Sequence, residues 1–384
     1  MTGALDGIRV VEFASYVSGP YAGMLLSDFG ADVVKVESPD GGDPFRGWGK
    51  PGYSSTFGSL NRNKRSVSID LKTPDGIAKA KQLIAASDVM IENYRMGVLD
   101  RMGLGYEAMH AVNPRLIYCS ITGFGNFGPY AKRPGYDTVG QGMGGLLSLL
   151  TDLDDPKPMG ISLSDHLAGM AAAMGVLAAI NARTLTGRGQ RVDTSLLEST
   201  VSFLAENAAR YFEDGDAPAR ATRTKIAQVF AFVAGDGLPF VIHLSSPPKF
   251  WEGLIAAVER PEWAADARFA DRKARMANYD DLHAELAAIF RTQPRSHWLE
   301  RLLQSDVPSG PLNDLKGVME DPQVAALKMV VEVPHPAVGS VSLIRSGVRL
   351  SDTPTTIKTA APALGQHNDE IFCDGALAGK PKAG

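Results

Sequence analysis

Short runs of β-branched and apolar residues recur through the first third of the chain. Residues 8–14 read IRVVEFA, and comparable runs lie at 32–37, 66–70, 88–91 and 115–121. Runs of this length that are apolar on both faces are typical of buried parallel strands. Helical patterns lie between them, at 20–29, 75–86 and 106–112. Strands that alternate with helices predict an α/β fold, with a Rossmann-like parallel sheet and helices on both of its faces.

The pattern changes after the fifth strand. Helical periodicity dominates from about residue 137 to residue 212, in segments at 141–150, 165–184 and 195–212. Residues 213–225 (EDGDAPARATRTK) are polar and contain Gly and Pro, which is typical of a linker. Next come QVFAFVA and PFVIHL around a GDG turn, a hairpin pattern, and then helical segments at 248–258, 279–291 and 296–304. We therefore predict a large α/β domain over 1–212, a linker over 213–225 and a smaller α+β domain over 226–315.

Composition narrows the class of protein. The chain has 384 residues and a net charge of −4, so it lacks the excess of basic residues that is typical of nucleic-acid-binding proteins. The N-terminal sequence has no signal-peptide pattern, and the apolar stretch at 169–182 is too short to span a bilayer. These features predict a cytoplasmic protein without a membrane partner. The two cysteines, Cys119 and Cys373, and the scattered histidines show no metal-ligand spacing, so we expect no metal site.

Two local motifs are weak indicators of chemistry. GFGNFG at 123–128 matches the dinucleotide-binding pattern, but Pro129 follows it instead of a helix, so we interpret it as a glycine loop that approaches another element. His166 follows Asp165 on a predicted helix, where neighbours point about 100° apart, so a surface or core role is expected for it.

Six longer segments, in order, resemble the class III CoA-transferase family, the group of formyl-CoA and carnitine CoA-transferases. They begin with LDGIRVVEFASYVSGPYAGMLLSDFGADVVKVE and NRNKRSVSIDLKTPDG. The others are DVMIENYRMGVLDRMGLGYE, NPRLIYCSITGFGNFGPYAKRPGYD, SDHLAGMAAAMGVLAAINARTLTGRGQRVDTSLLEST and APALGQHNDEIF. The resemblance implies that residues 316–384 form a second linker and return to the large domain. It also implies an interlocked homodimer that binds coenzyme A as part of its acyl-CoA substrate.

The resemblance places the catalytic nucleophile at Asp165, in SLSDHLAG. From the sequence pattern alone, an aspartate before a long Ala-rich helix is more often an N-cap, and Asp137 is open to the same interpretation. A carboxylate nucleophile would divide CoA transfer into steps through an aspartyl anhydride and an aspartyl-CoA thioester. Tyr136, Asp137 and Gln141 match a segment that lines the family's active site.

The resemblance also implies a set of CoA-binding positions. They lie after the first strand (Tyr16, Val17, Ser18), near the third (Ile69, Leu71), after the fourth (Asn93, Tyr94, Arg95, Val98, Arg101) and at the end of the fifth (Thr122). Many relatives have a basic residue where this chain has Ser38. Arg46, Arg62 or Lys64 are candidates to contact the CoA phosphates in its place.

Two alternatives have different functions. An alpha-methylacyl-CoA racemase would share the fold, but it pairs a histidine with the aspartate, and the matching position here is Tyr136. A phenol with a pKa of about 10 is a poor base at neutral pH, which favours transfer over racemisation. A non-catalytic CoA-binding protein is the other alternative, and it would not need Asp165.

Overall fold

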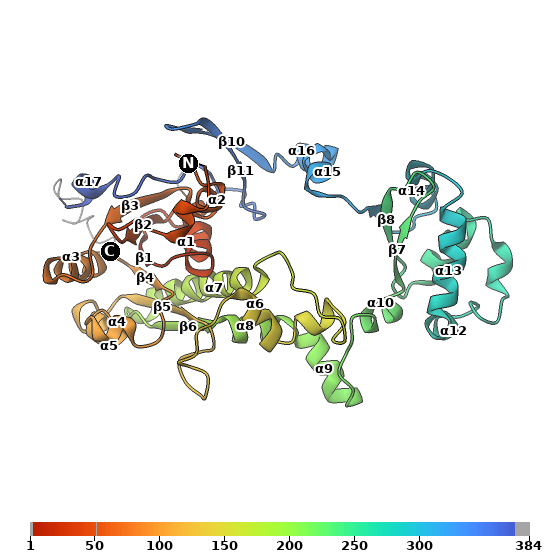
Figure 1. Cartoon of the computed structure of the whole chain (residues 1–384), viewed down its shortest axis with the longest axis horizontal. Coiled ribbons are helices and arrows are strands. Elements are labelled where there is room, and N and C mark those ends of the chain that lie inside the picture. The colour runs from red at the N-terminus through yellow and green to blue at the C-terminus, as the bar shows by residue number, and fades with distance from the viewer. Residues whose placement is uncertain (1–2, 51, 373–384) are drawn as a thin grey trace. The chain divides into compact units, whose positions relative to one another are not determined.

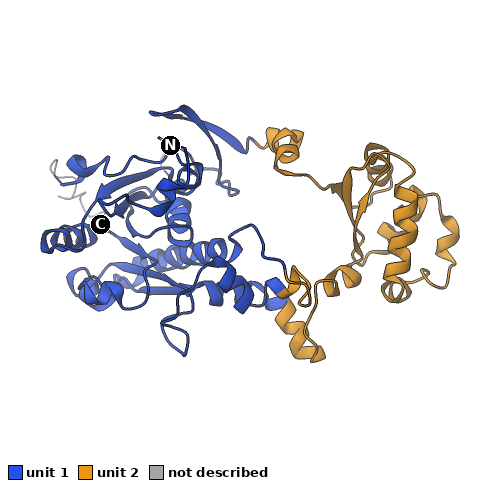
Figure 2. Ribbon diagram, viewed as in Figure 1, with its two compact units in different colours: residues 1–147, 157–206, 328–384 blue, residues 148–156, 207–327 orange. Residues whose placement is uncertain are grey.

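A computed structural model describes residues 3–50 and 52–372, so Cys373 lies outside the described residues. The chain divides into two compact units (Figure 2). Unit 1 contains Met1–Leu147, Lys157–Glu206 and Lys328–Gly384, and unit 2 contains Ser148–Pro156 and Asn207–Leu327.

Unit 1 is built on a parallel sheet of six strands in the order β3-β2-β1-β4-β5-β6 (Figure 1). The strands are β1 (Arg9–Phe13), β2 (Asp32–Glu37), β3 (Lys64–Ser68), β4 (Val89–Glu92), β5 (Ile117–Thr122) and β6 (Arg191–Ser195). Val10, Val33, Val89 and Ile117 are nearly or fully buried, as expected for strands covered on both faces. The predicted α/β fold with a parallel sheet is therefore confirmed.

The sequence pattern missed the sixth strand. Residues 191–195 read RVDTS, and β6 pairs with β5 at the edge of the sheet. Arg191 and Asp193 are exposed, so this strand lacks the apolar run by which the five others were recognised. The third strand begins two residues earlier than expected, at Lys64.

Helices cover the two faces of the sheet. One face packs against α1 (Ser18–Asp28) and α7 (Leu163–Thr186), and the other against α3 (Pro74–Ala85) and α5 (Tyr106–Val112). The shorter helices of unit 1 are η1 (Pro44–Gly47), α2 (Ser55–Asn61), α4 (Val98–Arg101), α6 (Asp137–Met143), η2 (Leu147–Leu149, which ends in unit 2) and α8 (Leu196–Phe203).

Two predicted helices differ from the observed ones. The segment expected at 141–150 is α6, which ends at Met143 because Gly144 and Gly145 follow and Gly145 has φ +82°. The segment expected at 195–212 divides into α8 and α9 (Ala205–Asp214), with Leu204 as the C-cap between them.

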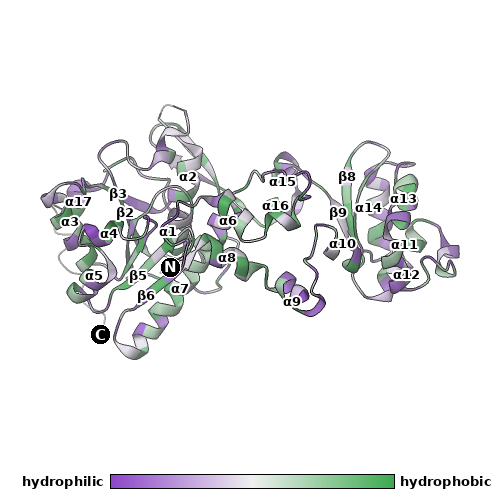
Figure 3. Ribbon diagram, turned by 60° about the horizontal axis from the view of Figure 1, so that its bottom comes forward, coloured by the Kyte–Doolittle hydropathy of each residue, from purple (hydrophilic) through white to green (hydrophobic). Residues whose placement is uncertain are grey.

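Helix α7 is the main helix on its face of the sheet. It has 24 residues and is long and apolar enough to cross a membrane, the one such helix in the described part of the chain. Hydrophobic residues run along it (Figure 3). Ala168, Ala172, Val176 and Ala179 pack into the sheet core, so one face of this helix is occupied by unit 1, while Met170 and Met174 are exposed. The sequence predicted that this apolar segment is too short to span a bilayer. That prediction is wrong about the length, because the helix has 24 residues.

The C-terminal part of unit 1 returns to the sheet. It contains the hairpin β10 (Val330–His335) and β11 (Gly339–Ile344), and α17 (Asn368–Phe372). The backbone N–H groups of Ser66 and Ser68 on edge strand β3 donate to His367 Nδ1 and Asn368 Oδ1, at 3.1 and 2.8 Å. Ile371 is buried against the same face as α3.

Unit 2 has its own aromatic core, which includes Phe230, Phe240, Phe290 and Trp298. Its antiparallel sheet consists of β7 (Val229–Val233), β8 (Pro239–His243) and β9 (Ser309–Pro311), and the predicted hairpin is confirmed by the pairing of β7 with β8. Its helices also include α10 (Thr222–Ala227), α11 (Pro248–Ala257), η3 (Pro261–Ala264), α12 (Arg272–Ala277), α13 (Tyr279–Phe290), α14 (Arg295–Gln304), α15 (Leu315–Glu320) and α16 (Pro322–Ala326).

Candidate active site

Asp165 lies in the first turn of α7, as its third residue. The helix begins at Leu163, and its N-cap, Ser162, makes no side-chain capping bond. The N-cap interpretation of Asp165 is therefore wrong. A carboxylate from elsewhere caps this helix: Asp137 Oδ1 accepts a hydrogen bond from the backbone N–H of Asp165 at 3.1 Å.

Gln141 orients that capping carboxylate. Its Nε2 donates to Asp137 Oδ2 and to the backbone oxygen of Ile161, the latter at 2.9 Å. Gln141 is 1% exposed, and both residues belong to α6. Asp137 is the first residue of α6, whose N-cap is Tyr136. Asp137 and Gln141 therefore support Asp165 through hydrogen bonds and are absent from the lining of the cavity described below.

The Asp165 side chain is only partly buried, and its carboxylate has no hydrogen bond or ion pair to any residue that the structure describes. Burial, followed by the negative charge of Asp137, raises the pKa of Asp165 to about 7. The N-terminus of α7 acts in the opposite direction, because its dipole favours the ionised form. An unpaired carboxylate with a raised pKa is a stronger nucleophile than a paired surface aspartate.

A cavity of about 310 Å³ opens in front of Asp165. Its wall comes from the turn after β1, the loop after β4, the end of β5 and the segment before α6. The lining residues are Ser15, Tyr16, Val17, Ser18, Asn93, Tyr94, Arg95, Met96, Ile121, Thr122, Gly123, Ala131, Arg133, Gly135, Tyr136, Asp165 and Leu196. Since the carboxyl ends of parallel strands are the usual ligand site of this sheet type, the location agrees with a binding role.

The structure brings together most of the side chains that the sequence resemblance selected. Asp165, Tyr136, Tyr16, Val17, Ser18, Asn93, Tyr94, Arg95 and Thr122 all line the cavity. Ile69, Leu71, Val98 and Arg101 do not. Ile69 is 3% exposed in the sheet core, so its side chain offers no free surface to an adenine ring. Arg101 is exposed at the end of α4.

The candidate phosphate-binding residues need correction. Lys64 is fully buried and lies 2.8 Å from Glu12, and Arg62 is buried with Asp28 at 2.6 Å. Arg46 holds Glu37 with two nitrogens, at 2.6 and 2.7 Å. None of these cations is available for phosphate without breaking a buried ion pair.

Arg133 is a lining residue that the sequence reasoning missed. It is exposed, its guanidinium lies 4.0 Å from the centroid of the Tyr130 ring, and it forms no ion pair with the described residues. A signal was present in the sequence, because this arginine lies within the segment NPRLIYCSITGFGNFGPYAKRPGYD that resembles the family. Arg133 and Arg95 are the two cationic side chains of the cavity wall.

Two phenols form one side of the cavity. The ring centroids of Tyr16 and Tyr136 lie 6.0 Å apart in an edge-to-face arrangement. Burial, and then the charge of Tyr136 and a hydrogen bond to it, raise the pKa of Tyr16. On another side, a Cβ built on Gly123 would lie 3.1 Å from the Cα of Gly135, so the predicted close approach of the 123–128 glycine loop is confirmed.

The cavity contains no second side chain suited to act as a base at neutral pH: among its described lining residues there is no histidine, lysine or glutamate, and Asp165 is the one aspartate. His166 points elsewhere, because its Nδ1 is 2.6 Å from the oxygen of Ser162 and its ring packs against Tyr21 at 4.6 Å. No cluster of three potential metal ligands occurs among the described residues.

Comparison with known proteins identifies close relatives over the whole length. A family model described as CoA-transferase family III matches residues 5–368. The succinyl-CoA–D-citramalate CoA-transferase of Chloroflexus aurantiacus is 36% identical, with 96% of this chain and 93% of that protein covered. The succinyl-CoA:glutarate CoA-transferase of Mus musculus is also 36% identical, with 96% and 85% covered. A crystal structure of a CAIB/BAIF family protein from Brucella suis has a TM-score of 0.86 and 37% identity, covering 97% of this chain and 100% of that one.

Proposed function

The chain belongs to CoA-transferase family III, and we propose that it moves coenzyme A from an acyl-CoA to a free carboxylic acid with Asp165 as nucleophile. The observation that carries this proposal is the unpaired carboxylate of Asp165 in a cavity at the carboxyl ends of the sheet strands. No other carboxylate lines the described wall of that cavity.

The proposed reaction proceeds through covalent intermediates. The Asp165 carboxylate attacks the thioester carbonyl, the C–S bond breaks, and CoA leaves as the thiolate from an aspartyl anhydride. The thiolate attacks the aspartyl carbonyl, releasing the first acid and leaving an aspartyl-CoA thioester. The acceptor carboxylate attacks this thioester to form a second anhydride, and the thiolate then attacks the acceptor carbonyl, which gives the new acyl-CoA and frees Asp165. Together, these steps divide one difficult exchange into several easier ones.

Asp137 has a supporting role in this scheme. It accepts the backbone N–H of Asp165 and is itself held by Gln141, which fixes the first turn of α7. Its negative charge contributes to the raised pKa of Asp165. The tetrahedral oxyanions also need donors, and the backbone of Gly123 and Gly135, which lines the cavity without side chains, is our candidate source.

Transfer fits this site better than racemisation does. A racemase needs two bases on opposite sides of the α-carbon, and the described wall provides one carboxylate and several tyrosines. Tyr136 stands at the position of the second base and is 63% exposed. A phenol stays protonated at neutral pH and would remove a proton slowly.

We propose short dicarboxylic acids as the exchanged acids. The similar proteins from Chloroflexus aurantiacus and Mus musculus are named for transfer between succinyl-CoA and citramalate or glutarate. The cavity fits a small acyl group, and two of its side chains are cationic. We assign Arg95 to CoA and Arg133 to the distal carboxylate of the acyl group, because a planar guanidinium matches a carboxylate.

The covalent intermediate can be trapped. The protein is incubated with succinyl-CoA and treated with borohydride or hydroxylamine, and peptide mass spectrometry then locates the modification. We expect modification at Asp165 and loss of transferase activity in Asp165→Ala. Full transferase activity of Asp165→Ala would refute the mechanism. Rapid exchange of an α-proton in deuterium oxide, without CoA transfer, would favour the racemase.

The acid specificity needs a separate experiment. Succinate, glutarate and butyrate are compared as acceptors for the wild type and for Arg133→Leu, with acetyl-CoA as the donor because it has no distal carboxylate. We expect the diacids to be preferred by the wild type, and Arg133→Leu to lose about tenfold to a hundredfold with diacids and little with butyrate. An equal loss with all three acids would assign Arg133 to CoA instead.

We also propose a homodimer. Met174 and Phe203 are 63% and 57% exposed, and Met170 on the same helix α7 is 46% exposed. Large hydrophobic side chains gathered on α7 and α8 favour burial by a second protein surface. Light scattering coupled to gel filtration should give a mass of two chains, and the mass of one chain at micromolar concentration would contradict this proposal.

A further inference from the structure

The turn that carries Tyr16 into the cavity has a strained backbone. Tyr16 has φ +66°, which places a bulky residue in the left-handed region that normally favours glycine. It sits between β1 and α1, and its neighbours Ser15, Val17 and Ser18 line the cavity with it. Such a conformation persists only where surrounding contacts hold it.

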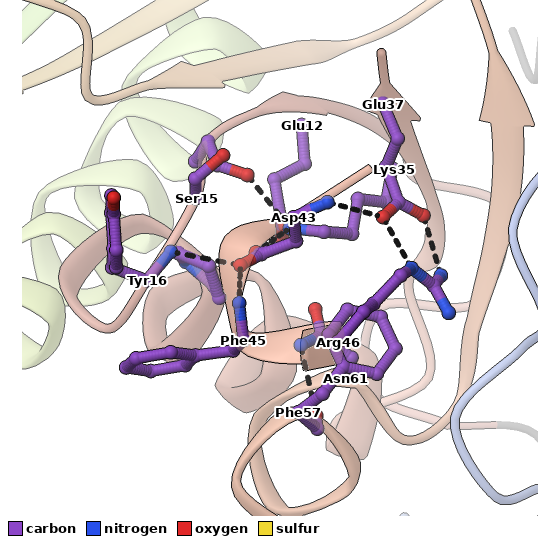
Figure 4. A network of polar contacts seen from close by, with 12 residues as sticks. Glu12, Ser15, Tyr16, Lys35, Glu37, Asp43, Phe45, Arg46, Phe57 and Asn61 are labelled. Carbon is purple, nitrogen blue, oxygen red and sulfur yellow. Dashed lines mark hydrogen bonds and ion pairs between the residues drawn. The ribbon is translucent and has the colours of Figure 1, made fainter. Parts of the chain in front are cut away.

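Side chains from three other segments hold this turn. Asn93 binds Ser15 on both sides: its Oδ1 accepts the Ser15 N–H at 3.0 Å, and its Nδ2 donates to the Ser15 oxygen at 2.8 Å. Lys35 Nζ donates to the oxygen of Ala14 at 2.7 Å. Asp43 Oδ1 accepts the N–H of Tyr16 at 3.4 Å and that of Phe45 at 3.0 Å (Figure 4).

Asp43 and Lys35 belong to a buried group of charges. Lys35 Nζ lies 3.0 Å from Asp43 Oδ2 and 3.0 Å from Glu12 Oε1, and all three side chains are 0% exposed. Lys64 completes the group at 2.8 Å from the other oxygen of Glu12. Two lysines balance two carboxylates, so the group is neutral as a whole. Breaking one of these pairs would leave a charge uncompensated in a low-dielectric interior, which is costly, so the pairs resist displacement.

We propose that Asp43 is a positioning residue, which uses its ion pair with Lys35 to hold Tyr16 in the left-handed conformation and against Tyr136. The inference rests on the proposed function, since it assigns Asp43 to the preparation of the acyl-CoA site. Without this support, Tyr16 relaxes to an ordinary φ and its ring leaves the cavity wall. Only a small fraction of the molecules then has the conformation that binds acyl-CoA. The apparent affinity for acyl-CoA falls in proportion to that fraction.

Asp43→Asn is a sharp probe because every partner of this carboxylate is a donor. Oδ1 faces two backbone N–H groups, and Oδ2 faces an ammonium. An amide must direct its own N–H₂ group at one of these donors, whichever way it is turned. In this variant Lys35 and Lys64 share Glu12 as their counter-ion, so the buried group gains one positive charge and we also expect lower thermal stability.

The experiment is a double-mutant cycle with Asp43→Asn and Tyr16→Ala. CoA affinity is measured by calorimetry and transferase kinetics with succinyl-CoA and glutarate. A left-handed bulky residue costs enough to shift the population about tenfold, so Asp43→Asn should weaken CoA binding and raise KM for succinyl-CoA by about tenfold. The effect on kcat should be smaller. In the Tyr16→Ala background the same substitution should change either value by less than about twofold.

Asp28→Asn is the matched control. Asp28 is equally buried and forms an ion pair with Arg62 at 2.6 Å, but it contacts none of residues 14–18 through its side chain. It should lower thermal stability and leave CoA affinity and KM unchanged. An equal effect of Asp43→Asn with and without Tyr16, or an equal effect of Asp28→Asn, would overturn the proposal.

A second measurement remains available if Asp43→Asn fails to fold. Glycine adopts a left-handed backbone without strain, so Tyr16→Gly should have a higher melting temperature than Tyr16→Ala. Equal melting temperatures would show that the turn is not held in this conformation, which would also overturn the proposal. If the wild type binds CoA but transfers none, the proposed function fails, and the calorimetric cycle still decides the role of Asp43.

Discussion

Replacing the proposed nucleophile should stabilise the protein at alkaline pH. Asp165 is partly buried, and its pKa is raised from 3.8 to about 7 by burial and by Asp137. That displacement corresponds to at most roughly 4 kcal/mol in favour of the protonated form. Because the carboxylate faces an open cavity, solvent screening reduces the value, and we expect Asp165→Asn to raise the free energy of unfolding by about 2–3 kcal/mol at pH 8.

The sign follows from proton linkage. The folded state retains a proton on Asp165 at pH values where the unfolded state has lost it, so the folded protein binds more protons. The wild type therefore loses stability as pH rises from about 4 to about 7, and above that the penalty is constant. Asparagine never ionises, so its advantage should be small at pH 4 and complete at pH 8.

The assay is urea unfolding of both proteins between pH 4 and pH 8, followed by circular dichroism. Tryptophan fluorescence is less suitable, because three of the four tryptophans belong to unit 2 and the fourth, Trp48 in unit 1 with Asp165, is already exposed in the folded protein. Asp40→Asn, at an exposed position, is the control for removing a negative charge. If Asp165→Asn is destabilising at pH 8, or its effect is the same at pH 4 and pH 8, the carboxylate is not destabilised by its surroundings and our reasoning fails.

Three further outcomes follow from the same contacts. The kcat/KM of transfer should rise with pH through an apparent pKa near 7, as Asp165 ionises, and a flat profile between pH 6 and 8 would contradict this. Gly169→Ala should destabilise the protein by about 1–3 kcal/mol in urea unfolding, since its Cβ would lie 2.7 Å from the backbone oxygen of Ser18 where α7 meets α1. Phe290→Ala should cost about 3–5 kcal/mol by removing a fully buried ring from the core of unit 2, and a loss below 1 kcal/mol would contradict that packing.

The parallel sheet was predictable because burial on both faces leaves a distinctive apolar run. Strands β1, β2, β4 and β5 carry that run, and each was recognised near its observed bounds. The edge strand β6 was not, since two of its five residues are exposed and no apolar run remains. The predicted domain limits stay predictions. The main part of unit 2 begins after Glu206 and ends at Leu327, whereas the predicted limits of the large and small domains were residues 212 and 315.

The cavity was only partly predictable. Motif resemblance selected the turn after β1 and the loop after β4, which do line it. It also selected Ile69, which is buried in the core. A motif identifies a position in the chain but does not show whether the side chain at that position is exposed. Arg133 was missed since a short basic pair, here Lys132 and Arg133, usually belongs to a solvated surface. The ion pair of Asp43 with Lys35 was equally invisible, because it depends on how the loop after β2 folds over the sheet.

The interpretation of Asp165 shows what tertiary structure adds to a local pattern. An aspartate at the start of an Ala-rich helix is well suited to be a cap, and the local pattern, taken without the family resemblance, favours that interpretation. In the structure, Asp137, 28 residues earlier, accepts the backbone N–H of Asp165. Asp165 therefore does not cap the helix, and its own carboxylate has no hydrogen-bond or ion-pair partner among the described residues. Burial raises the pKa of Asp165, and the negative charge of this same neighbour raises it further. One hydrogen bond between distant segments thus separates the capping function from the chemical one, and Asp137→Ala should impair both helix stability and transfer.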